Sequence, residues 1–113
     1  MNLKINKLEK KIGVNFKNKS LLKKALTHKS ANQIDNNEKL EFLGDRVIGL
    51  ILSKKIIDLY PNEEEGNLDK RFAKLVNRDT CSKIAWSIDV QKYLFIGDSH
   101  KKISKQDSKI LSD

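Results

Sequence analysis

The chain has 113 residues, of which 38% are hydrophobic and 34% charged, and a formal net charge of +8, which fits one water-soluble domain with a single core. No apolar run reaches the roughly 18 residues of a membrane-spanning helix, and the basic N-terminus lacks the apolar segment of a signal peptide. The single cysteine, Cys81, excludes an internal disulfide and is typical of a reducing cytoplasm.

The positive charge favours a polyanionic partner, with nucleic acid the first expectation. Arg46, Arg71 and Arg78 are the only arginines, and the other basic residues are lysines. Lysine binds phosphate as a point charge, whereas arginine is the usual base reader. The alternative interpretation is a solvated lysine surface without a partner, and composition alone leaves the two equally open.

Helical periodicity dominates the chain. The segments with apolar residues at helical spacing are 3–12, 21–29, 38–60 and 68–88. Ser20 stands where a cap of the second segment would lie, and Asn36 or Asn37 stands where a cap of the third would lie. Pro61 is expected to stop the third segment. Residues 90–97, VQKYLFIG, form the one candidate strand. The closing ILSD looks like the start of a further apolar element, so we expect the chain to be truncated there.

Three carboxylates share one face of the long helix predicted from residue 38. At about 100° per residue, Glu38, Glu41 and Asp45 lie within an arc of about 60° over two turns. Apolar residues continue this face along the helix, which places the acids at the edge of a buried or interfacial surface. The opposite side is expected to be a core stripe formed by Leu40, Leu43, Val47, Leu50 and Ile51.

No lysine or arginine follows any of these acids at the i,i+4 spacing, and Glu41 faces Asp45, a like-charge pair that costs roughly 0.2–0.5 kcal/mol. The cluster therefore needs bound protons, a basic side chain from another helix, or a cation. Carboxylate oxygens select hard divalent ions, so Mg²⁺ or Mn²⁺ is the favoured occupant, with a structural acid cluster as the alternative. Gly44 and Gly49 indicate close approach of a second helix or a nucleic-acid backbone.

These residues resemble a known signature. NEKLEFLGDRVIGL (Asn37–Leu50) is similar to the ribonuclease III family motif, which reads close to N-E-R-L-E-F-L-G-D-A-V-L. ALTHKS (Ala25–Ser30) resembles the family's A-L-T-H-R-S, and EGNLDKRFAKLVN, from Glu65, resembles its E-G-x-L-[ST]-x-x-R-A-x-L-V segment. ILSD resembles the family's I-L-A-D. The resemblance spans nearly the whole chain, in the family's order.

The resemblance implies an all-α endonuclease domain over residues 1–113 that forms a homodimer. Such a domain hydrolyses double-stranded RNA with Mg²⁺, or Mn²⁺ in its place, and processes ribosomal and messenger RNA precursors in bacteria. Glu41, Asp45 and Asp113 match metal ligands, and Glu38 joins Glu41 and Asp45 as a catalytic acid. Glu38 and Glu65 match positions that line the same acidic valley. Phe42 matches an aromatic residue that packs across the dimer interface.

The chain departs from the family pattern at two places. Arg46 stands where the family has Ala or Ser, and it either pairs with an acid or reaches phosphate. The family also has a metal-binding glutamate three residues after the position of Asp113, and a double-stranded-RNA-binding domain beyond it; the chain ends before both. A catalytically silent RNA-binding or dimerisation module is therefore the alternative function, and a plain helical interaction protein is the third. We expect His28 to pack or hydrogen-bond rather than catalyse.

Overall fold

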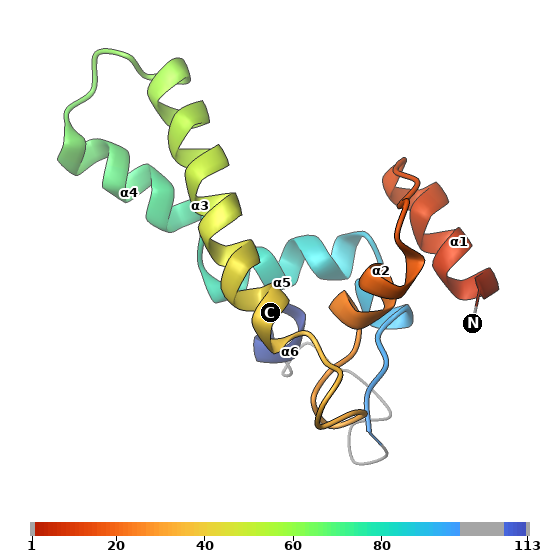
Figure 1. Cartoon of the computed structure of the whole chain (residues 1–113). Helices are drawn as coiled ribbons and strands as arrows, with labels where there is room; N and C mark the ends of the chain where they lie inside the picture. The colour runs from red at the N-terminus through yellow and green to blue at the C-terminus, as the bar shows by residue number, and fades with distance from the viewer. Residues whose placement is uncertain (1, 98–107, 113) are drawn as a thin grey trace.

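The computed structural model consists of helices joined by turns and loops, with a long loop between residues 26 and 37 (Figure 1), and it describes residues 2–97 and 108–112. The elements are α1 (Asn2–Ile12), α2 (Lys19–Ala25), α3 (Glu38–Leu59), α4 (Glu65–Leu75), α5 (Arg78–Ser87), the 3₁₀ turn η1 (Val90–Lys92) and α6 (Ser108–Ser112). The all-α prediction is confirmed. Among the helices that the structure describes, none is long and apolar enough to span a bilayer.

The strand predicted over residues 90–97 is wrong. This segment begins with η1, and the β pairing in the described part of the chain is one isolated bridge between Thr27 and Phe95. The apolar side chains of the segment pack against α1 and α2 instead of entering a sheet. A strand pattern needs a partner strand to be realised, and a lone pair of extended segments is marginal in water.

Asparagine side chains bind the backbone at the starts of α2 and α3: Asn18, not the predicted Ser20, caps α2, whereas the N-cap of α3 is the predicted Asn37, whose own side chain makes no cap bond. The side-chain oxygen of Asn18 accepts a hydrogen bond from the Leu21 amide at 3.0 Å, which caps α2 in place of Ser20. The buried side chain of Asn36 accepts a hydrogen bond from the Glu38 amide at 3.1 Å, in the first turn of α3. Each bond satisfies an amide that has no partner within the helix.

The main hydrophobic core lies between α1 and α2, around Ile5, Leu8, Leu22 and Leu26. Glu9 is buried beside it, and its carboxylate accepts hydrogen bonds from the Lys19 ammonium and from the Phe16 amide. These two bonds, that of Lys19 first, hold the pKa of Glu9 below its ordinary value. A charged side chain therefore ties the end of α1 to the start of α2.

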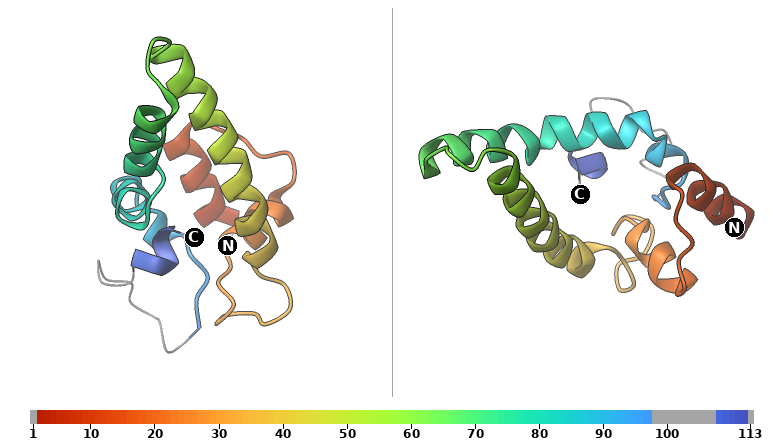
Figure 2. Two further views of the ribbon diagram at one scale, coloured as in Figure 1. Left: turned by 90° about the vertical axis from the view of Figure 1, so that its left-hand side faces the viewer. Right: turned by 90° about the horizontal axis from the view of Figure 1, so that it is seen from above.

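The helices α3 and α4 form a hairpin that extends to one side of the molecule, away from α1 and α2 (Figures 1 and 2). Arg71 donates from Nε and Nη2 to the Glu63 carboxylate, both at 2.6 Å, and its guanidinium lies 3.4 Å from the centroid of the Tyr60 ring. A Cβ atom on Gly49 would lie 3.7 Å from the Phe72 ring of α4. This is an ordinary van der Waals distance, so α4 is the neighbour of Gly49 without an approach that requires glycine. At Gly44 an added Cβ atom would meet no heavy atom within 4 Å, so no second helix approaches that position in the described part of the chain.

The core stripe predicted on α3 is wrong for most of its length. Leu43 is 57% exposed, Val47 48%, Leu50 73% and Ile51 60%, and Ile56 is the one buried residue of this helix. Helical periodicity identifies the apolar side of a helix but not the element that covers it. Here α3 packs chiefly on α4, which leaves the stripe open.

Candidate functional site

The ALTHKS segment forms a junction that fixes the start of α3. The Thr27 carbonyl accepts a hydrogen bond from the amide of Asn37, the residue before α3, at 2.9 Å. On either side of Thr27, the His28 amide donates to the Phe95 carbonyl and the Phe95 amide donates to the Leu26 carbonyl, both at 2.9 Å. One backbone bond thus ties the residue before α3 to this segment, and two more tie the segment to Phe95. The start of α3, with Glu38 and Glu41 in its first turns, is positioned by this junction.

Ser30 closes the same junction. Its hydroxyl oxygen lies 2.8 Å from Nδ1 of His28 and accepts a hydrogen bond from the Gly97 amide at 2.9 Å. His28 therefore takes part in loop hydrogen bonding, in line with the role expected from the sequence. A Cβ atom on Gly97 would lie only 2.4 Å from the Ser30 carbonyl oxygen, so this position requires glycine.

We predict that Gly97→Ala lowers the free energy of unfolding by about 1–3 kcal/mol, because the added methyl group overlaps backbone atoms and forces the junction apart. Gly66→Ala is the matched control, since a Cβ atom at Gly66 in α4 meets nothing within 4 Å. It is expected to be neutral or to stabilise by up to about 1 kcal/mol. Urea unfolding followed by circular dichroism measures both, and equal midpoints for the two variants would contradict the prediction.

Glu41 and Asp45 line one cavity of about 240 Å³ beside the start of α3, which we call the acid cavity. Its other walls come from distant parts of the chain, through Ala25 at the end of α2, Cys81 on α5 and Ser112 on α6. Glu41 is half-buried and Asp45 is exposed. Nothing in the sequence marked Cys81 as a neighbour of the acids, because a lone cysteine on a helix carries no spacing pattern.

Glu38 and Glu65 do not line the acid cavity. The Glu38 carboxylate is 61% exposed, and its Oε1 lies 3.8 Å from Nζ of Lys29. This lysine is a basic partner from outside the helix, which the sequence had left as an open alternative. Glu65 begins α4, beyond the far end of α3, and about 27 Å of helix separates Glu41 from Leu59. A single chain therefore does not bring Glu65 to the other acids.

Asp113 lies outside the described residues, although its neighbour Ser112 reaches the acid cavity. Within residues 2–97 and 108–112, no group of three or more histidine, cysteine or acidic side chains is arranged to hold a metal ion. The two carboxylates of the acid cavity nevertheless fit a hard divalent ion. Proteins usually bind Mg²⁺ through one or two carboxylates, with waters and substrate phosphates completing its shell.

Arg46 contacts an aromatic side chain on its own helix. Its guanidinium lies 3.8 Å from the centroid of the Phe42 ring, and its Nη1 donates to the Phe42 carbonyl at 3.1 Å. Neither an acid nor another charged group is paired with Arg46 among the described residues. Phe42 remains 62% exposed, so Arg46 covers one face of an aromatic ring at the surface.

The model of the family described as Ribonuclease-III-like matches residues 18–113. The chain belongs to the ribonuclease III-like family. It is 52% identical over 108 residues to Ribonuclease 3 of Pelagibacter ubique, covering 95% of this chain and 48% of that protein. It is 43% identical to Ribonuclease 3 of a Nitratiruptor species, covering 86% of this chain and 43% of that protein. The chain thus spans about half the length of these curated relatives.

Two solved structures of the nuclease domain of ribonuclease III from Campylobacter jejuni share the fold. The first has a TM-score of 0.90 and 38% identity, covering 96% of this chain and 76% of that one. It shows structural flexibility in a region of the Campylobacter jejuni domain that is involved in dimer formation. The second, a crystal structure, has a TM-score of 0.87 and 38% identity, covering 95% of this chain and 74% of that one. The nuclease-domain fold expected from the motifs is confirmed.

Proposed function

We propose that residues 1–113 carry the catalytic site of an endoribonuclease that hydrolyses phosphodiester bonds of double-stranded RNA, with Mg²⁺ or Mn²⁺, in the processing of ribosomal and messenger RNA. The observation that carries this proposal is the shared cavity of Glu41 and Asp45. Both acids come from the motif that resembles the ribonuclease III signature. A nuclease needs such a carboxylate pair because hydrolysis of a phosphodiester builds negative charge that a cation must offset.

Glu41, Asp45 and Asp113 are the residues we assign to the ion. When bound, a divalent ion supplies a water of lowered pKa and a positive charge opposite the scissile phosphate. The carboxylates fix the position of that charge and, without it, repel the RNA backbone. Gly44 also lines the acid cavity, and the space where its Cβ atom would lie has no heavy atom within 4 Å. The absence of a side chain there leaves room for the sugar-phosphate backbone.

We also propose that the chain works as a homodimer, with Phe42 at the interface. The exposed ring of Phe42 lies on α3 together with the exposed apolar stripe of Leu43, Val47, Leu50 and Ile51. Monomeric proteins rarely leave an apolar patch of this kind open. Dimerisation also gives Glu65 its role, because a second chain is needed to bring that acid to the valley that holds Glu41. The cytoplasmic location remains a prediction.

Incubation of the chain with duplex RNA tests the proposed activity. We expect cleavage in the presence of Mg²⁺ and none when a chelator removes it. Binding of the duplex without cleavage, even after the chain is extended by the helix that would hold the family's last metal-binding glutamate, would instead identify a silent RNA-binding or dimerisation module. If the chain neither bound nor cleaved the duplex, the remaining interpretation would be a helical interaction protein whose basic charge has no role in RNA recognition.

A further inference from the structure

The positive charge of the protein is concentrated at its N-terminal end. Residues 1–34 contain nine lysines and a single acidic residue, Glu9, whereas residues 35–113 contain 14 basic and 14 acidic residues. The segment that forms α1 and α2 therefore carries the entire net charge of +8, and the rest of the chain is balanced. A field of one sign over one pair of helices attracts polyanions to that surface.

We propose that this surface binds the phosphate backbone of RNA next to the acid cavity and so extends the footprint of the substrate; the inference rests on the proposed function. The surface, which we call the lysine face, consists of Lys4, Lys7, Lys10, Lys17 and Lys23. In the described part of the chain none of the five forms an ion pair, whereas the other four lysines of the segment each lie near a carboxylate. The lysine face thus carries the positive charge of this segment that no ion pair in the described part of the chain offsets.

Two members of the lysine face converge on one aromatic ring. Nζ of Lys4, from α1, lies 5.1 Å from the centroid of Phe95, and Nζ of Lys23, from α2, lies 5.7 Å from it. The ring attracts each ammonium weakly. A phosphate that approaches the Phe95 ring could accept charge-assisted hydrogen bonds from these ammonium groups, which are stronger than their contact with the ring.

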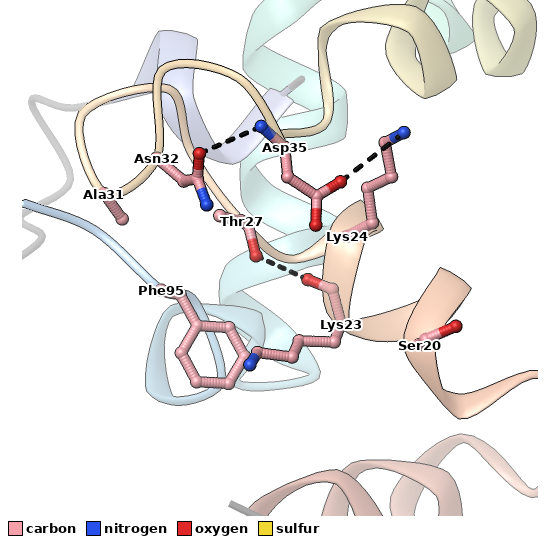
Figure 3. Close-up of a pocket in the computed structure, with 8 residues that line it drawn as sticks. All are labelled: Ser20, Lys23, Lys24, Thr27, Ala31, Asn32, Asp35 and Phe95. Carbon is pink, nitrogen blue, oxygen red and sulfur yellow. Dashed lines mark hydrogen bonds and ion pairs between the residues drawn. The ribbon is translucent and has the colours of Figure 1, made fainter.

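A cavity of about 420 Å³ opens beside Lys23 and Phe95, with Ser20, Thr27 and Asn32 also in its walls (Figure 3). Its one carboxylate, Asp35, lies 3.6 Å from Nζ of Lys24, which leaves the Lys23 ammonium beside the Phe95 ring. Hydroxyl, amide and ammonium groups are the side chains that commonly contact the phosphates and sugars of a nucleic-acid backbone. The hydroxyls of Ser20 and Thr27 already donate within the protein, to the Asn18 side chain and the Lys23 carbonyl, both at 2.6 Å. The Lys23 ammonium and the Asn32 amide are therefore the donors that this cavity offers to a phosphate.

The helix α2 connects the lysine face to the acid cavity. Ala25, the last residue of α2, lines the acid cavity. Lys23 and Lys24, which directly precede Ala25 in the chain, line the cavity of about 420 Å³ described above. An RNA strand whose scissile phosphate lies at Glu41 and Asp45 would therefore have α2 as its neighbour. Electrostatic attraction by the lysines would offset the repulsion that the nearby acids exert on the strand.

The architecture of α1 favours RNA over a lipid surface as the partner. A helix that lies in a membrane interface inserts an exposed apolar face between lipids. In α1, Ile5 and Leu8 are already buried in the core against α2, and Leu3 is the one apolar side chain of this helix that is well exposed. A lysine-bearing helix without an apolar face to insert suits backbone contact with nucleic acid, which is electrostatic and independent of sequence.

A matched pair of triple variants tests the proposal. Lys7→Gln/Lys10→Gln/Lys23→Gln removes three charges from the lysine face, and Lys55→Gln/Lys70→Gln/Lys83→Gln removes three from the balanced remainder. The dissociation constant for a duplex RNA is measured by fluorescence anisotropy with a chelator present, so that no strand is cut, from about 50 to 200 mM salt. Circular dichroism checks that both variants fold as the unchanged protein does.

We expect the lysine-face variant to bind at least about 10-fold more weakly at low salt, and the slope of log affinity against log salt to fall by roughly 2–3, close to one per lost phosphate contact. The control variant should stay within about twofold of the unchanged protein. Three results would each overturn the proposal. The two variants could bind RNA with equal affinity, or the unchanged protein could fail to bind RNA. In a parallel measurement with phosphatidylglycerol vesicles, the lysine-face variant could lose affinity for the vesicles but not for RNA. Failure of the proposed nuclease function is seen separately, as absence of Mg²⁺-dependent cleavage while the lysine-face variant still loses RNA affinity.

Discussion

Replacement of Asp45 by asparagine is expected to slow Mg²⁺-dependent cleavage of duplex RNA by at least about 100-fold. Substitutions that only support a metal ligand commonly cost 10–100-fold, and loss of a charged ligand should cost at least as much. The asparagine keeps the size of the side chain, and Asp45 is exposed in the acid cavity, so the fold should be unchanged. RNA affinity in chelator should also be retained, because a carboxylate repels phosphate rather than binding it.

Asp58→Asn is the matched control for this substitution. Asp58 lies on the same helix, its side chain is 55% exposed, and its carboxylate pairs with Lys54 at 2.6 Å, far from the acid cavity. An exposed pair of this kind contributes about 0.3–0.5 kcal/mol, so the control should cleave RNA at nearly the rate of the unchanged protein. If Asp45→Asn cleaved at the same rate as Asp58→Asn, Asp45 would have no part in catalysis.

Replacement of Phe42 by alanine is expected to weaken self-association by about 30-fold or more, which corresponds to the 2 kcal/mol typical of an aromatic hot spot. Phe42 is 62% exposed in the single chain, and Arg46 stacks on one face of its ring. In the proposed dimer, the remaining surface of the ring faces the second copy. Burial of a large aromatic side chain supplies the apolar contact area that such an interface needs.

Sedimentation equilibrium over a range of protein concentrations measures this effect. Leu3→Ala is the control, because Leu3 is a large apolar residue of similar exposure, 68%, on a helix remote from α3. The control should keep the dissociation constant of the unchanged dimer. A monomeric unchanged protein, or equal weakening by both substitutions, would remove Phe42 from the proposed interface.

Local signals in the sequence predicted α3 and its acids well. Asparagines before Glu38 and Pro61 after Tyr60 bracket the helix that the structure places over Glu38–Leu59, because both residue types act on the backbone within a turn. The 3.6-residue period then placed Glu41 and Asp45 on one side of the helix. Both acids do line one cavity. Their position side by side depends on α3 alone, which is why the helical period could predict it.

Features that depend on contacts between elements were not predictable in the same way. Periodicity could not show that Leu50 would be exposed, that Lys29 would approach Glu38, or that Cys81 would line the acid cavity. Each of these depends on how loops orient one helix against another, over separations that no spacing rule covers. Glu65 differs from these cases, since its place beyond the far end of α3 follows from the length of the helix alone.

The central claim is that Glu41 and Asp45 hold a hard divalent cation in the acid cavity. A crystal of the protein grown with Mn²⁺ and measured at the manganese absorption edge tests it most directly. We expect an anomalous difference peak at about 2–2.3 Å from carboxylate oxygens of both residues, as for hard ions with oxygen ligands. A cavity without such a peak, with both carboxylates turned to bulk solvent or bound to a lysine, would contradict the claim.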